Sequence, residues 1–238
     1  MANSILFALA AALANIIGGL IVTSQKWAQR SLRYFIALGA GFMLGTVFLE
    51  MTPESFMLTR AAPALILLGY LIVHLFEHAF ASHLHFGEET HHDEISNRAV
   101  GISALVGLLV HTFFDGVAIG AGFAISQTMG LVIFLAVFLH KIPDGFTISS
   151  LFISSGHSGS QAFAAATALG VSTIVGVLTV HLVGGGVTYA LPISTGSTLY
   201  VAATDLMPEA NREKGVDMAF LVFAGMGLFL LIKMAAQI

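Results

Sequence analysis

The sequence contains eight apolar runs, each about as long as a membrane's hydrocarbon core is thick. They cover roughly residues 3–23, 34–54, 62–84, 99–125, 127–153, 160–184, 188–209 and 215–236. A helix needs about 20 mostly apolar residues to cross a bilayer, and each run meets or approaches that length. Only 9% of the residues are charged, whereas a soluble domain carries about 25%. The sequence therefore predicts an all-α integral membrane protein with eight transmembrane helices.

The spans leave no room for a separate soluble domain, so residues 1–238 are predicted to form one transmembrane domain with a His-rich loop at about 85–98. The loop charges favour an orientation in the cell membrane with both termini outside and this loop in the cytoplasm, because cytoplasmic loops carry more Lys and Arg. The net charge of −4 argues against a nucleic-acid partner. In this orientation six basic residues face inward, namely Lys26, Arg30, Arg33, Arg98, Arg212 and Lys214, and two face outward, namely Arg60 and Lys233.

The pattern acid-x-x-Pro-Glu occurs twice, at residues 50–54 near the end of the second span and at residues 205–209 near the end of the seventh. With eight spans, these two helices run in opposite directions across the membrane. A repeat in opposite directions is typical of transporters whose binding site lies near the midplane, between the repeats. Chance similarity of two short Pro-containing helix ends is the alternative explanation for this pattern taken alone.

A second pattern, His-x-x-x-Asp-Gly, occurs at residues 111–116 and again at 140–145, in two further spans that run oppositely. Residues four apart share one face of a helix, so His111 points with Asp115, and His140 with Asp144. Two imidazoles and two carboxylates suit Zn²⁺, and also Fe²⁺, Mn²⁺ or Cd²⁺, better than Mg²⁺ or Ca²⁺. Ionisable residues inside a membrane span indicate function by default, although such pairs can also link helices structurally.

The chain resembles the ZIP (Zrt/Irt-like protein) family of divalent metal transporters over essentially its whole length. The resemblance is carried by the two His-x-x-x-Asp-Gly motifs, by the Pro-Glu ends of the second and seventh spans, and by the His-rich loop. The resemblance implies eight helices in a 3+2+3 arrangement with inverted repeats. It implies uptake of Zn²⁺, or of a related divalent ion, into the cytoplasm, with no catalytic cofactor. The residues that match the family's metal ligands are His111, Asp115, His140 and Asp144.

Three positions depart from the pattern of family members that hold two metals. Thr112 stands where they usually have Asn, Lys141 where they usually have an acidic or similar ligand, and Thr179 where they often have Glu, the last alignment being loose by a residue or two. Two carboxylates neutralise one divalent ion, and a second ion would need further acids. We therefore expect one metal, with the Lys141 ammonium in the second place, held charged by the carboxylates. The alternative is that Lys141 snorkels away or pairs with an unrelated acid.

Further polar residues are candidates for the transport pathway. The residues His74, Glu77 and His78 would form a release site, or would merely snorkel to the interface. His181 is a ligand, a proton carrier or a packing group. The full candidate set for the pathway is Glu50, His74, Glu77, His78, His181, Asp205 and Glu209. Loop histidines among acids bind metal weakly, as a buffer or sensor, unless they are merely solvated; these are His83, His85, His91 and His92.

Two other functions compete with metal uptake. An intramembrane zinc hydrolase needs a general base beside a metal-bound water, and the sequence has no His-Glu-x-x-His motif. A cation-diffusion-type exporter also uses His-x-x-x-Asp pairs, but it would bring six spans and a soluble metal-binding domain. The glycine-rich helix faces would allow a homodimer, and no motif requires one.

Overall fold

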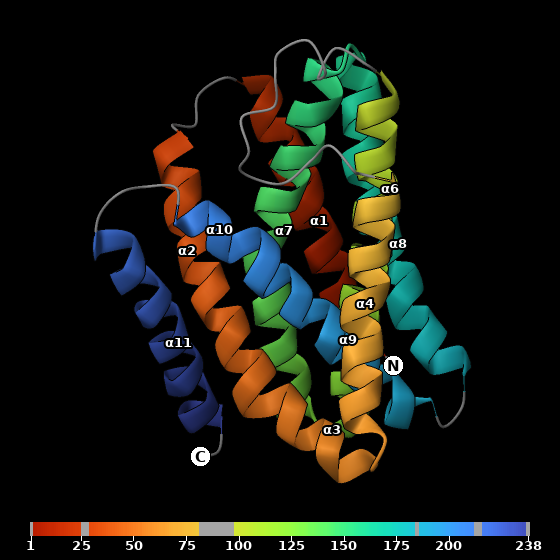
Figure 1. Cartoon of the computed structure of the whole chain (residues 1–238), viewed down its shortest axis with the longest axis vertical. Coiled ribbons are helices and arrows are strands. Elements are labelled where there is room, and N and C mark those ends of the chain that lie inside the picture. The colour runs from red at the N-terminus through yellow and green to blue at the C-terminus, as the bar shows by residue number, and fades with distance from the viewer. Residues whose placement is uncertain (1, 25–28, 81–97, 184–185, 212–215, 237–238) are drawn as a thin grey trace.

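The computed structural model describes residues 2–24, 29–80, 98–183, 186–211 and 216–236, and nearly all of these are helical. Both chain ends lie at the lower end of the bundle in Figure 1, which we call the terminal end. The opposite end is called the loop end. In chain order the elements are α1 (Ala2–Ser24), α2 (Gln29–Thr46), η1 (Val47–Met51), α3 (Thr52–Leu58), α4 (Ala62–Phe80), α6 (Arg98–Ile125), α7 (Gln127–Ser154), α8 (Gly159–Leu182), α9 (Val187–Tyr200), η2 (Val201–Leu206), α10 (Met207–Ala210) and α11 (Val216–Ala236).

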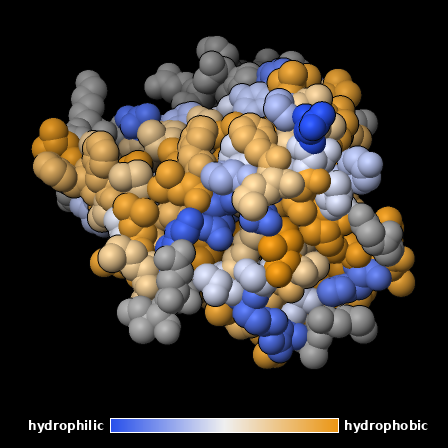
Figure 2. Space-filling view, turned by 90° about the horizontal axis from the view of Figure 1, so that it is seen from below, coloured by the Kyte–Doolittle hydropathy of each residue, from blue (hydrophilic) through white to orange (hydrophobic). Residues whose placement is uncertain are grey.

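Within the described residues, seven helices are long and apolar enough to cross a membrane unaided. The remaining predicted span, at 188–209, consists of α9, η2 and α10, which follow one another without a break from Val187 to Ala210. The prediction of an all-α membrane protein is therefore confirmed. Figure 2 views the terminal end, where hydrophilic patches lie among mainly hydrophobic residues.

The helices pack in pairs that repeat across the molecule. Helix α2 packs on α11, and α4 packs on α9, through glycines that let two backbones touch. A Cβ atom at Gly41 would overlap the carbonyl of Val222, and a Cβ atom at Gly196 would overlap the carbonyl of Ile66. The two contacts are equivalent after a shift of about 155 residues, as the inverted repeat requires.

The inner helices follow the same symmetry. Helix α7 meets α1 where Gly145 lies against the carbonyl of Asn15, and α6 meets α8 where Gly116 lies against the carbonyl of Thr173. Both glycines directly follow the aspartate of a His-x-x-x-Asp-Gly motif. Their lack of a side chain therefore sets how closely the two motif helices approach their neighbours.

The acid-x-x-Pro-Glu pattern marks a local change of helix type in each repeat. The π-helical segment η1 ends just before Pro53, and η2 ends just before Pro208. Proline has no N–H to donate, so the carbonyl four residues earlier loses its helical partner and the helix widens locally. The two sequence echoes thus produce the same structure, and the repeat is not a chance similarity.

We expect Gly145→Ala to destabilise the fold, because its methyl group has no space beside the Asn15 backbone. Overpacking of this kind costs about 1–3 kcal/mol. Thermal unfolding of the purified protein in detergent measures the loss. Gly227→Ala is the matched control, since nothing lies within 4 Å of a Cβ atom there. Equal midpoints for the two variants would show that the α1–α7 contact is not close-packed in the folded protein.

Candidate metal centre

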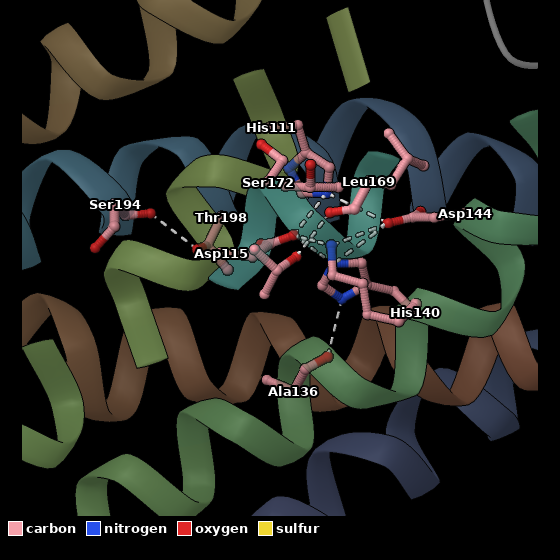
Figure 3. Close-up of polar contacts among 12 residues, drawn as sticks. His111, Asp115, Ala136, His140, Asp144, Leu169, Ser172, Ser194 and Thr198 are labelled. Carbon is pink, nitrogen blue, oxygen red and sulfur yellow. Dashed lines mark hydrogen bonds and ion pairs between the residues drawn. The ribbon is translucent and has the colours of Figure 1, made fainter. Parts of the chain in front are cut away.

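The two motif helices bring four polar side chains together in the middle of the bundle. His111 and Asp115 come from α6, and His140 and Asp144 come from α7 (Figure 3). One ligand atom from each residue lies within 4.8 Å of the other three. All four residues are buried, and the most exposed of them, Asp144, is only 7% exposed. The structure thus assembles the cluster that the two sequence motifs predict.

The nitrogen–oxygen separations within the cluster are close to those of a tetrahedral metal site. Oδ2 of Asp115 lies 3.1 Å from Nε2 of His111 and 3.2 Å from Nε2 of His140. Oδ2 of Asp144 lies 3.6 Å and 3.8 Å from the same two nitrogens. Bonds of about 2.1 Å to a tetrahedral ion would separate the ligand atoms by about 3.4 Å. The donor set therefore has the chemistry and the size for an ion such as Zn²⁺.

The histidine rings are oriented for coordination. Nδ1 of His140 lies 3.0 Å from the carbonyl of Ala136, which accepts its hydrogen and leaves the Nε2 lone pair facing Asp115. A hydrogen bond from the second ring nitrogen fixes many metal-binding histidines in this way. Both ring nitrogens of His111 and Oδ1 of Asp115 are buried without a hydrogen bond. Buried unsatisfied atoms are rare in native structures, and one of these, Nε2 of His111, faces the two carboxylates.

Lys141 is part of the same cluster. Its side chain is fully buried, and its ammonium contacts Oδ2 of Asp115 and lies 3.4 Å from Oδ2 of Asp144. The ammonium therefore pairs with the site's own acids and does not snorkel away. At the equivalent position in α6, Thr112 donates its hydroxyl to the carbonyl of Leu109, at 3.2 Å. The two halves of the centre thus differ by one buried positive charge.

Thr179 is the third position that departs from the two-metal pattern. Its hydroxyl donates to the carbonyl of Val175 on its own helix, at 2.8 Å, and its neighbour Val180 packs at Gly120. The hydroxyl of α8 that does reach α6 beside Thr112 is that of Ser172, which donates to the carbonyl of Leu109 at 2.8 Å. The sequence lacks a signal for this register, because it depends on how α8 slides along α6.

A small cavity borders the centre on the side of Asp205 and Glu209. Its volume is about 20 Å³, enough for one water-sized group. His111 and Asp144 line it at the centre, and Asp205 and Glu209 line it further along. Pro143, which interrupts the hydrogen bonds of α7, also lies on its wall. Two of the predicted pathway acids therefore line the same small cavity as two residues of the cluster.

The other pathway candidates lie in different surroundings. Glu77 packs against Gly107 of α6 and faces the hydroxyl of Tyr200. The rings of His74 and His78 lie 4.0 Å apart, centre to centre, at exposed positions on α4. Tyr200, which links α4 to the end of α9, belongs to no motif, so its place beside Glu77 could not be predicted from the sequence.

Two candidates are engaged at the terminal end. His181 lies 2.7 Å from the hydroxyl of Ser4, an interaction that ties α8 to α1. Glu50 forms an ion pair of 2.6 Å with Lys233 of α11. The sequence identifies Lys233 only as a basic residue on the outer side, not as the partner of Glu50. Outside the described residues lie the loop histidines His83, His85, His91 and His92, with almost all of the predicted loop at 85–98.

The sequence is similar to those of known zinc transporters. Residues 83–233, more than half of the chain, match the family described as "ZIP Zinc transporter". The chain is 30% identical over 151 residues to "Zinc transporter SLC39A7" of Homo sapiens, covering 58% of this chain and 32% of that protein. It is 31% identical over 160 residues to "Zinc transporter ZIP9" of Micropogonias undulatus, covering 61% of this chain and 50% of that protein.

The chain spans between about a third and a half of the length of these relatives. The family match covers both His-x-x-x-Asp-Gly motifs and both helices that carry them. Together with the bundle of membrane-spanning helices and the buried His/Asp cluster, it shows that this chain belongs to the ZIP zinc transporter family.

Proposed function

We propose that this protein carries a divalent metal ion, Zn²⁺ before Fe²⁺, Mn²⁺ or Cd²⁺, across the membrane through the His/Asp cluster. The ligands are His111, Asp115, His140 and Asp144. The observation that supports this most directly is the gathering of two imidazole nitrogens and two carboxylate oxygens within 4.8 Å in the membrane interior. Ionisable groups are costly there unless they serve a ligand or one another.

The proposal includes a single ion at the centre. Asp115 and Asp144 together carry two negative charges, and the Lys141 ammonium lies against both of them. A second divalent ion would have to displace this ammonium, and the described part of the cluster offers no third carboxylate. Lys141 then acts as a tethered cation in the place that a second metal takes in two-metal members of the family.

The proposed route runs from the terminal end through the cluster and out along Asp205 and Glu209. Asp205 and Glu209 line the same small cavity as His111 and Asp144, which supports this direction. If both termini lie outside the cell membrane, as the loop charges predict, this direction is into the cytoplasm. Each proposed ligand comes from one chain, so the site does not depend on a homodimer. In that orientation the predicted His-rich loop is cytoplasmic, and its histidines would bind metal weakly.

The hydrolase alternative has less support. It needs a general base positioned at a metal-bound water, and the residues that follow the two histidines are Thr112 and Lys141. The hydroxyl of Thr112 is turned to the carbonyl of Leu109, and the ammonium of Lys141 is paired with the acids. Membership of a transporter family also favours transport over hydrolysis.

Uptake of radioactive Zn²⁺ into proteoliposomes tests the proposal. We expect accumulation with the native protein and none above empty liposomes with His111→Ala or Asp144→Ala. His157→Ala and Asp217→Ala are matched controls outside the cluster and should retain uptake. Unchanged uptake in both cluster variants would remove these residues from the pathway. The same assay with Fe²⁺, Mn²⁺ and Cd²⁺ as competitors ranks the ions.

A further inference from the structure

Asn15 is a polar residue in the middle of the apolar helix α1, and its side chain is completely buried. Neither Oδ1 nor Nδ2 of its amide has a hydrogen-bond partner within the described part of the chain. Buried amides are normally hydrogen-bonded, because leaving them unpaired away from water is costly. The two sequence motifs and the candidate pathway give this amide no role, so its surroundings must explain it.

The backbone of Asn15 packs directly beside the metal centre. A Cβ atom at Gly145 would overlap the carbonyl of Asn15, and Gly145 directly follows the proposed ligand Asp144. One turn earlier on α1, Ala12 faces Gly170 of α8. Asn15 therefore lies on the face of α1 that meets both α7 and α8, and its side chain points between those two helices.

The direction of the helices shows which residue of α7 the amide approaches. Helices α1 and α7 run the same way, since Phe7 contacts Phe134 near their starts and Asn15 contacts Gly145 further along. Side chains on a helix lean toward its N-terminus, so the amide leans from the level of Gly145 to the turn before it. One turn before Gly145, on the same face of α7, stands Lys141.

The inverted repeat shows that this half of the centre differs from the other. The glycine contacts of the inner helices pair Asn15 with Thr173, and the two sequence motifs pair Lys141 with Thr112. The hydroxyl of Thr173 donates to the carbonyl of Leu169 at 3.2 Å, and that of Thr112 also bonds within its own helix. One half thus has two satisfied hydroxyls, whereas the other has a buried ammonium and an unpartnered amide.

The ammonium of Lys141 shares an oxygen with the proposed ion. Its partners in the structure are Oδ2 of Asp115 and, at 3.4 Å, Oδ2 of Asp144. Oδ2 of Asp115 is also the oxygen that lies 3.1 Å and 3.2 Å from the two imidazole nitrogens, so an ion among the four ligands would bind it. Such an ion repels the ammonium, because like charges interact strongly in a weakly polar interior. The ammonium, which has three N–H donors, then needs an acceptor on the side away from the ion.

We infer that the amide oxygen of Asn15 is an alternative acceptor for the Lys141 ammonium, toward which the ammonium moves when a divalent ion binds Oδ2 of Asp115. An amide oxygen accepts this hydrogen bond without adding a negative charge. The ammonium stays beside the carboxylates, where Oδ1 of Asp115 is buried without a partner. Before an ion binds, the amide dipole already helps to stabilise the buried charge. Asn15 is thus a positioning residue that acts through Lys141, and only the arrival of the ion rests on the proposed function.

Thermal unfolding of the metal-free protein in detergent tests the pairing of Asn15 with Lys141. Asn15→Leu removes the amide at similar size, and should lower the midpoint by about 2–4 °C, the shift that loss of one hydrogen bond causes in a chain of this length. In a Lys141→Met background the same substitution should not lower the midpoint, because its partner is already gone. Lys141→Gln is a second background in case Lys141→Met does not fold.

Calorimetric titration with Zn²⁺ tests the movement of the ammonium. Asn15→Leu should weaken binding by about tenfold in the otherwise native chain, because the ion then meets an ammonium without its alternative acceptor. It should leave binding unchanged when Lys141 is replaced. Ser197→Ala is the matched control for both experiments, since the Ser197 hydroxyl is also buried and unpartnered among the described residues but lies on α9. Its effects should be the same in both backgrounds.

An equal fall in the midpoint with Asn15→Leu in both backgrounds would overturn the inference, because the residue would then act through packing alone. Unchanged Zn²⁺ affinity of Asn15→Leu, in a chain that binds the ion, would also overturn it. If the native chain fails to bind Zn²⁺ while the midpoints depend on Lys141 as expected, the zinc proposal fails and the pairing stands. If Zn²⁺ binds and the midpoints do not depend on Lys141, the inference fails and the zinc proposal stands.

Discussion

Asp115→Asn is expected to lower the affinity of the purified protein for Zn²⁺ by more than about 100-fold, because even the loss of a supporting group beside a metal ligand costs 10–100-fold. Oδ2 of Asp115 is the atom on which the centre converges, since it contacts Nε2 of His111, Nε2 of His140 and the ammonium of Lys141. The amide keeps the shape of the side chain but removes its charge. One remaining carboxylate would then face both a buried ammonium and a divalent ion.

Isothermal titration calorimetry in detergent measures this effect. Asp217→Asn, an exposed acid in the first turn of α11, is the matched control and should bind Zn²⁺ as the native chain does. Circular dichroism of both variants checks that the helices are intact. An Asp115→Asn protein that is helical and still binds Zn²⁺ with native affinity would exclude Asp115 as a ligand.

Lys141→Met should produce the second large effect, in the absence of metal. Removing one partner of a fully buried ion pair costs about 3–5 kcal/mol, because the other partner is left uncompensated. Here two buried carboxylates would be left without their cation. A divalent ion supplies the missing charge, so Zn²⁺ should stabilise the variant more than it stabilises the native protein.

Thermal unfolding with and without Zn²⁺ tests both parts of this expectation. Lys233→Met is the matched substitution, because that lysine is partly exposed and its pair is expected to contribute at most about 1 kcal/mol. If Lys141→Met unfolds at the temperature of Lys233→Met without metal, the buried ammonium does not balance the acids of the centre.

The sequence alone predicts most of this fold because hydropathy is a local property. Each apolar run becomes a helix at nearly the predicted residues, and the i, i+4 spacing by itself places His111 with Asp115 and His140 with Asp144. The acid-x-x-Pro-Glu echo likewise predicts the inverted repeat, and a π-helical turn precedes the proline in each copy.

Contacts between helices are harder to predict because they depend on how far one helix slides along another. The motif alignment places Thr179 beside the centre; its hydroxyl bonds to its own helix, whereas that of Ser172 on α8 donates to the carbonyl of Leu109 on α6. The pair of Glu50 with Lys233 joins positions far apart in the sequence, and neither residue carries a local sign of the other.

Anomalous scattering at the zinc absorption edge, from crystals grown with Zn²⁺, tests most directly whether the centre holds one ion with Lys141 in the second place. The expected result is a single strong peak among His111, Asp115, His140 and Asp144, at about 2.0–2.2 Å from their ligand atoms, with the Lys141 ammonium still on the carboxylates. Two peaks that share Asp115 and Asp144, with Lys141 turned away, would contradict the one-metal centre. No peak at the cluster would contradict the metal site itself.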